Sequence, residues 1–113
     1  MRLRRPLFLA VLILGPAFAP TQAQAQAETQ AQSVQRGMAL ARANCGRCHS
    51  IARSGPSPFV EAPPFRTLHK RYPVETLEEA LGEGIFTGHP AMPEFQLNPG
   101  QIGDFIAFLK SLE

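Results

Sequence analysis

Apolar residues recur at helical spacing in three parts of the chain. Along residues 33–45, 74–81 and 98–112 they follow the i, i+3, i+4, i+7 spacing that places side chains on one face of a helix. No stretch alternates convincingly at the period of two that marks a half-buried strand. The pattern therefore predicts an all-α domain. The residues that form the three stripes are Val34, Gly37, Met38 and Ala41; Val74, Leu77 and Leu81; and Ile102, Phe105, Ile106 and Leu109.

Capping residues indicate where these helices begin. Ser33 is a suitable N-cap for the first helix, and Pro73 precedes the middle one, where proline is tolerated. The last helix has the fullest signal, with Asn98 as N-cap, Pro99 in the first turn and Gln101 at the capping-box position. We therefore expect ordered structure to begin near Ser33 and the last helix to begin at Pro99.

Two segments between the helices are expected to be loops. Residues 85–93 contain glycine and proline, and residues 50–68 are richer still in both. A loop as long as the second one, inside a small domain, is normally functional or wraps around something. The residues of that loop that exclude a long helix or a central strand are Gly55, Pro56, Pro58, Pro63 and Pro64.

Residues 1–25 have the pattern of a secretory signal peptide. A basic start with Arg2, Arg4 and Arg5 precedes an unbroken apolar run at residues 7–14. Ala-x-Ala triplets follow, and we expect cleavage near residues 25–27. The run is shorter than the roughly 18 apolar residues that a membrane span needs, which argues against an uncleaved anchor.

Cleavage divides the chain and changes its charge. It leaves an Ala/Gln-rich segment at residues 26–32, expected to be flexible, and one domain at residues 33–113. The whole chain of 113 residues has 11 Lys and Arg against 9 Asp and Glu, and loss of three arginines leaves a net charge of −1. The mature chain therefore has no basic excess that would favour nucleic acid. A domain this small usually needs a cofactor or a crosslink to stabilise it.

The sequence Cys-Gly-Arg-Cys-His at residues 45–49 has the spacing of a covalent haem attachment site. Cys45 and Cys48 lie one helical turn apart, so their thiols can add to the two vinyl groups of one porphyrin. His49 follows directly and offers its imidazole as an iron ligand. Met92 is the candidate for the opposite face, because the other methionines are the initiator and Met38, which lies on a helix stripe. Haem attachment outside the cytoplasmic membrane and the signal peptide together favour a periplasmic location.

Other interpretations compete at two of these positions. A thioredoxin-like redox pair is expected in a βαβ context, and a zinc site needs a second pair of ligands, neither of which the sequence offers. A disulfide between Cys45 and Cys48 is compatible with their number, but it gives no role to His49 or Met92. His89 is the rival of Met92 as iron ligand, since imidazole also binds iron.

With these elements in order, residues 34–112 resemble the class I c-type cytochromes. In that family a first helix leads into the attachment motif, and a methionine loop precedes the last helix. The two helices cross at a glycine against an aromatic residue, which Gly37 and either Phe105 or Phe108 match. Such a crossing would justify a glycine that costs up to about 1 kcal/mol within a helix. The resemblance implies the cytochrome c fold, with three main helices and loops wrapped around one covalently attached haem c.

The resemblance also implies roles for two loop residues. The proline segment of the family matches Pro63, whose carbonyl would accept a hydrogen bond from Nδ1–H of His49, with Pro64 as the close alternative. Such a bond fixes the tautomer of the imidazole and makes its iron-bound nitrogen more basic. The methionine loop of the family matches Met92, followed by Pro93.

Polar residues near these loops are candidates for contacts at the haem edge. Arg71 and Tyr72 are suited to bind the haem propionates, one by its charge and one by its hydroxyl, although a solvated basic loop is as reasonable an interpretation. A docking patch for a partner protein is a weaker hypothesis, and its candidate residues are Arg47, Arg53, Lys70 and Arg71.

The resemblance implies a one-electron carrier between periplasmic or membrane redox partners, such as an oxidase, reductase or dehydrogenase, and not an enzyme. A thioether ligand would close the iron to substrates and favour its reduced form. If Met92 does not bind iron, a haem-based ligand-binding or peroxidase-like protein is the alternative. A third possibility is the fixed cytochrome subunit of a periplasmic dehydrogenase. We expect no nucleic-acid partner and no membrane span in the mature chain.

Overall fold

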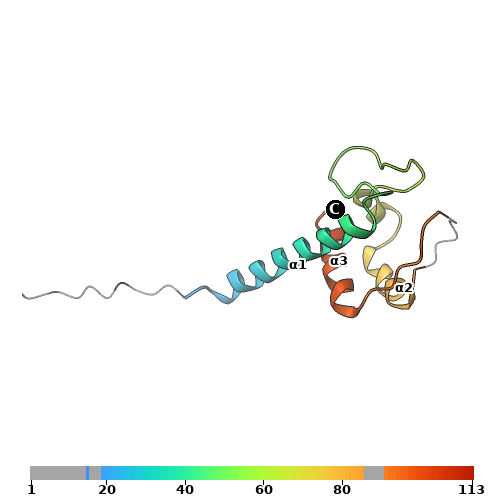
Figure 1. Ribbon diagram of the computed structural model, residues 1–113. Coiled ribbons are helices and arrows are strands. Elements are labelled where there is room, and N and C mark those ends of the chain that lie inside the picture. The colour runs from blue at the N-terminus through green and yellow to red at the C-terminus, as the bar shows by residue number, and fades with distance from the viewer. Residues whose placement is uncertain (1–14, 16–18, 86–90) are drawn as a thin grey trace, which may run out of the picture.

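The computed structural model describes residues 15, 19–85 and 91–113 (Figure 1). Within these ranges no strand is present, and only an isolated antiparallel bridge joins Ile85 to Phe95. The all-α architecture that the apolar pattern predicted is therefore confirmed. The helical elements, of which η1 and η2 are 3₁₀-helices, are α1 (Gln22–Asn44), η1 (Phe65–Lys70), η2 (Val74–Thr76), α2 (Leu77–Glu83) and α3 (Pro99–Lys110).

The first helix begins well before the expected position. Its N-cap is Thr21, whose backbone N–H donates to Gln24 Oε1 over 2.8 Å, so the N-cap role that we assigned to Ser33 is wrong. Alanine and glutamine are good helix formers, and they extend the helix although they present no apolar face. Residues 26–32, expected to be flexible, are therefore helical here, and all are solvent-exposed. Figure 1 shows this part of α1 projecting away from the rest of the domain.

The proposed signal peptide stays a prediction, because residues 1–14 and 16–18 lie outside the described part of the chain. Cleavage near residues 25–27, which lie within α1, likewise stays a prediction. Among the helices that the structure describes, none is both long enough and apolar enough to cross a membrane.

A close crossing of α1 and α3 forms the centre of the fold. Gly37 is buried at this crossing, and a Cβ added to it would lie 1.9 Å from the carbonyl oxygen of Asp104 and 2.8 Å from Cβ of Phe108. Because real atoms do not approach so closely, a side chain at this position would force the helices apart. The crossing that the sequence suggested is present, and of the two aromatic candidates it is Phe108 that meets the glycine.

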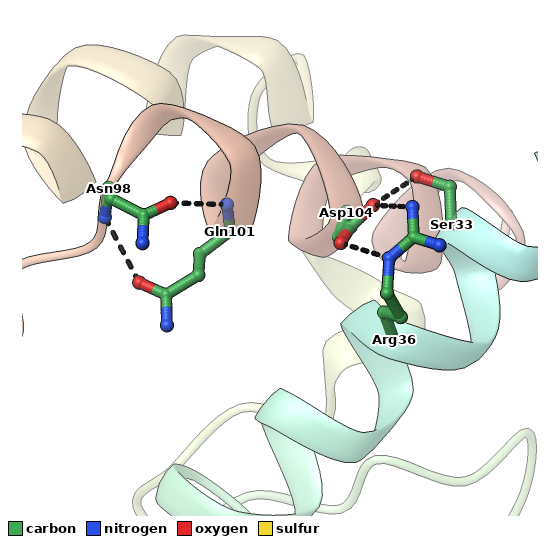
Figure 2. A network of polar contacts seen from close by, with 5 residues as sticks. All are labelled: Ser33, Arg36, Asn98, Gln101 and Asp104. Carbon is green, nitrogen blue, oxygen red and sulfur yellow. Dashed lines mark hydrogen bonds and ion pairs between the residues drawn. The ribbon is translucent and has the colours of Figure 1, made fainter.

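A cluster of polar side chains closes the same crossing at its solvent edge (Figure 2). Arg36 donates from Nε to Oδ2 of Asp104 over 2.7 Å and from Nη2 to Oδ1 over 2.8 Å. Ser33 Oγ donates to Oδ1 of the same carboxylate over 2.5 Å. Ser33 therefore joins α1 to α3 instead of capping a helix. The hydrogen bonds from Arg36 and Ser33 hold the pKa of the Asp104 carboxyl below its ordinary value, with Arg36 contributing most.

The last helix has the cap that its sequence predicted (Figure 2). Asn98 Oδ1 accepts from the backbone N–H of Gln101 over 2.9 Å, and Gln101 Oε1 accepts from that of Asn98 over 3.1 Å. The apolar face of α3 then packs into the core, where Leu109 is 1 % exposed. Val74 at the start of η2 is equally buried, so the middle stripe joins the same core.

Candidate haem-binding site

The Cys-x-x-Cys-His motif at residues 45–49 follows directly on the last turn of α1. Cys45 is the C-cap of α1, and its backbone N–H donates to Ala41 over 2.8 Å. Its carbonyl then accepts from the N–H groups of Cys48 and His49 over 3.1 and 2.9 Å. This tight turn brings both thiols and the imidazole to the wall of one cavity, and all three side chains are half-buried there.

The cavity has a volume of about 900 Å³, within the range of sites that hold cofactors. Its walls come from α1, the loop after it, η1, α2, the segment before α3, and α3 itself. Most of the wall is apolar, so it suits a large flat hydrophobic group better than a hydrated one. The apolar residues that line it include Leu40, Phe59, Ala62, Phe65, Leu68, Leu77, Leu81, Ile85, Phe95, Leu97 and Phe105.

The imidazole of His49 is held by a hydrogen bond and an aromatic contact. Its Nδ1 lies 2.8 Å from the carbonyl oxygen of Pro63, which can only accept, so Nδ1 is the protonated nitrogen. Pro64, the alternative partner, instead accepts from the backbone N–H and the hydroxyl of Thr67 over 2.9 and 2.7 Å. The ring centroid of Phe65 lies 4.9 Å from that of His49. The structure thus distinguishes Pro63 from Pro64, which the sequence did not.

Met92 faces the same cavity from a different part of the chain. Its side chain is half-buried, and the loop that carries it is closed at its base by backbone hydrogen bonds. Ile85 N–H donates to Phe95 over 2.9 Å, and Leu97 N–H donates to Leu81 over 2.8 Å. The rival ligand, His89, lies outside the described residues.

The two cysteines are free thiols, and the environment of Cys45 does not favour its thiolate. Burial, with a smaller contribution from the neighbouring Cys48, raises the pKa of the Cys45 thiol to about 11. Reactive redox pairs depend on the opposite shift, toward a stabilised thiolate. In the part of the chain that the structure describes, no three or more His, Cys, Asp or Glu side chains gather as a metal site. The raised pKa of Cys45 therefore argues against a reactive redox dithiol.

The other polar candidates separate into two groups. Arg47, Arg71 and Tyr72 line the cavity and are also exposed to solvent, as residues at a haem edge would be. Arg53 instead donates a hydrogen bond to the carbonyl of Ser111 near the end of the chain. The cavity wall includes neither Arg53 nor Lys70, so the four proposed docking residues do not all gather at its rim.

Comparison with known proteins agrees with this geometry. The family model described as cytochrome c matches residues 34–113, which is well over half of the chain. The chain belongs to the cytochrome c family. A relative in Bradyrhizobium diazoefficiens, cytochrome c-552, is 30 % identical over 76 residues, covering 67 % of this chain and 71 % of the relative. No solved structure matches significantly.

As a member of this family, the cytochrome carries one covalently bound haem c and transfers electrons. The side chains around the cavity suit that group in kind and number. The thiols of Cys45 and Cys48 lie one turn apart, and the thioether of Met92 comes from another loop. The imidazole of His49 donates its Nδ1 proton to Pro63, so its Nε2 carries no proton. The walls of the cavity are mostly apolar, which suits a porphyrin ring.

Sequence reasoning missed part of the wall of this cytochrome's cavity. Leu40, Leu81 and Leu97 face the cavity, whereas the helical stripes had marked such residues only as core or left them unassigned. For Leu40 a signal was present, because it lies three residues after Gly37 and so near the same helix face. Leu97 had none, because it belongs to a short segment without periodicity.

Proposed function

We propose that this cytochrome carries single electrons between redox proteins outside the cytoplasmic membrane. Cys45 and Cys48 would hold the haem through thioether bonds, and His49 and Met92 would supply the two protein ligands of its iron. The observation that carries this proposal is the convergence of these four side chains, from two distant parts of the chain, on one apolar cavity.

Each side chain has a defined task in this proposal. The hydrogen bond to Pro63 keeps the proton of His49 on Nδ1, so that Nε2 is available for iron and is more basic than a free imidazole. Met92 offers a soft thioether that favours ferrous iron and leaves no open position for a substrate. When bound, the haem supplies the one-electron chemistry, and the surrounding chain keeps its ligands fixed.

The location rests on the sequence of residues 1–25, which has the basic start, apolar run and small-residue triplets of an export signal. The partners follow from the chemistry: an electron donor and an acceptor that meet the haem edge through small, short-lived interfaces. Arg71 and Tyr72, exposed at the cavity, are suited to bind the haem propionates there.

Expression with export and a haem attachment system tests the proposal. We expect the mass of the mature protein to correspond to cleavage near residues 25–27 plus one haem. We expect the double variant Cys45→Ala, Cys48→Ala to lose the covalent haem. Recovery of a folded, haem-free wild type with a Cys45–Cys48 disulfide would overturn it.

A redox titration of the haem-loaded protein tests the carrier role. One reversible one-electron step, with no turnover of peroxide, is the expected result. Peroxide consumption at an enzymatic rate would instead favour the peroxidase-like alternative.

A further inference from the structure

The guanidinium of Arg66 joins two parts of the chain that lie beside the haem cavity. Arg66 is in the first turn of η1, three residues after Pro63. Its Nη1 donates to Ser50 Oγ and to the carbonyl of Ala52, both over 3.3 Å. Its Nη2 donates to the carbonyl of Gly55 over 2.7 Å. One side chain thus bonds to three points along the loop that follows His49.

The loop end of this connection is buried and connected to His49. Ser50, which follows His49 directly, is only 7 % exposed. Its carbonyl accepts from the backbone N–H of Phe65 over 3.0 Å, and its own N–H donates to Ser57 Oγ over 3.0 Å. Ser50 is therefore the point at which the segment after His49 is fastened to the segment after Pro63.

These contacts involve chain neighbours of the hydrogen bond between His49 Nδ1 and the Pro63 carbonyl, which is 2.8 Å long. Its donor is next to Ser50 in the chain, and its acceptor is three residues before Arg66. The backbone hydrogen bond from Phe65 to Ser50 joins the two segments at one point. Among the described residues, Arg66 is the polar side chain that adds contacts to Ser50 Oγ and to the carbonyls of the loop, and so resists a widening that would lengthen the His49–Pro63 bond.

We propose that Arg66 is a positioning residue for His49. It holds the two segments at the separation that keeps the His49–Pro63 hydrogen bond short, and through that bond it sets the basicity of the imidazole. The inference rests on the proposed function, in which His49 is the iron ligand.

The chemistry of arginine explains why this residue type suits the position. A planar guanidinium presents several N–H donors in a fixed fork, so it can reach a hydroxyl and two carbonyls at once. Lysine keeps the charge but offers one compact ammonium, which cannot span the same three acceptors. The substitution Arg66→Lys therefore separates geometry from charge.

The expected consequence is a change at the haem without loss of the fold. With the segments less firmly joined, the Nδ1 proton of His49 exchanges with solvent faster, by roughly tenfold, because a charged hydrogen-bond network has been removed. A weaker bond also makes the imidazole less basic, which stabilises ferric iron less, so the reduction potential rises. The charge on the protein is unchanged, so charge loss cannot cause either effect.

The experiment compares three haem-loaded variants with the wild type by NMR of the reduced protein and by redox titration. Arg66→Lys is the test, and Ser50→Ala removes one acceptor while keeping Arg66. Arg53→Lys is the matched control, because Arg53 lies in the same loop but bonds to Ser111 and not to Ser50. We expect faster Nδ1 exchange and a raised potential in Arg66→Lys, the same in smaller degree in Ser50→Ala, and neither in Arg53→Lys.

The experiment distinguishes failure of the proposed function from failure of the role assigned to Arg66. If the wild type lacks a protected His49 Nδ1 proton or a low-spin spectrum, the pair of iron ligands assigned to His49 and Met92 is wrong, and the proposed function is wrong with it. If the wild type has both, and Arg66→Lys changes exchange and potential no more than Arg53→Lys does, the positioning role of Arg66 is overturned while the proposed function stands.

Discussion

At the scale of single residues, the proposed function depends on the contacts of His49 and Met92. The Nδ1–H of His49 donates to the carbonyl of Pro63, so the other ring nitrogen, Nε2, carries no proton and is available as a ligand. Met92 reaches the same cavity from a loop whose base is closed by backbone hydrogen bonds. A thioether–iron bond is weak by itself, so the closed loop matters for keeping it formed.

Replacing Met92 by alanine is predicted to open the iron. The variant should have a lower reduction potential, because the ligand that favours ferrous iron is gone, and its reduced form should bind carbon monoxide. Met38 provides the matched control, since it packs against the core from α1 and does not face the cavity. Absorption spectra of the reduced variants, with and without carbon monoxide, make the comparison.

Three results would contradict that prediction in different ways. Rapid carbon monoxide binding by the wild type would mean an open iron and would favour a ligand-binding protein. An unchanged spectrum in Met92→Ala together with an opened iron in His89→Ala would mean that two histidines bind the iron. Equal effects of Met92→Ala and Met38→Ala would indicate general unfolding instead of ligand loss.

At the scale of elements, the crossing of α1 and α3 holds the attachment motif in place. The motif continues the end of α1, so the position of α1 on α3 fixes where the thiols lie. Gly37 permits the close approach, and Asp104 supplies both the backbone that it meets and the carboxylate that Ser33 and Arg36 bind. Substitutions at this crossing should therefore act on stability first.

Alanine substitutions at two helical glycines should have opposite effects. Gly37→Ala places a Cβ against the Asp104 carbonyl and is expected to cost about 1–3 kcal/mol of unfolding free energy, despite the better helix propensity of alanine. Gly103→Ala in α3 meets nothing within 4 Å and is expected to stabilise the protein by roughly 0.5–1 kcal/mol. Denaturant unfolding of the haem-loaded proteins measures both, and equal effects would refute the close crossing.

The carboxylate of Asp104 predicts an acid-dependent contribution to stability. Its pKa is lower in the folded protein than in the unfolded chain, so its stabilisation is fully present above the ordinary aspartate pKa of about 3.9 and is lost as the pH falls below it. Unfolding of the wild type and of Asp104→Asn, compared between pH 7 and pH 2, should show a difference that shrinks across this acid range. A difference that is constant with pH would contradict this assignment.

At the scale of the whole molecule, the sequence predicted the helical class, the cap of α3, the glycine crossing and the motif. It could do so because each depends on residues close together in the chain or on one strong steric constraint. The start of α1 was predicted wrongly, because Ala/Gln repeats form a helix by propensity alone and show no stripe. The choice between Pro63 and Pro64, and the part played by Arg66, depend on how distant loops meet, which periodicity does not encode.

The exposed first part of α1 should contribute little to the stability of the domain. We expect the free energy of unfolding of a haem-loaded protein that begins at Gln32 to lie within about 0.5 kcal/mol of that of a protein that begins at Gln26, because residues 26–32 are all exposed. Trimming further to Val34 removes the hydrogen bond from Ser33 to Asp104 and should lower stability measurably. A large loss on the first truncation would show that this helical segment packs on something.

The absorption spectrum of the oxidised, haem-loaded wild type tests the central claim most directly, namely that the iron lies between His49 and Met92. A sulfur ligand on ferric haem iron gives a weak band toward the far red. The account predicts a low-spin spectrum with this band, and its loss in Met92→Ala but not in Met38→Ala. A low-spin wild-type spectrum without the band, or a high-spin spectrum, would contradict the account.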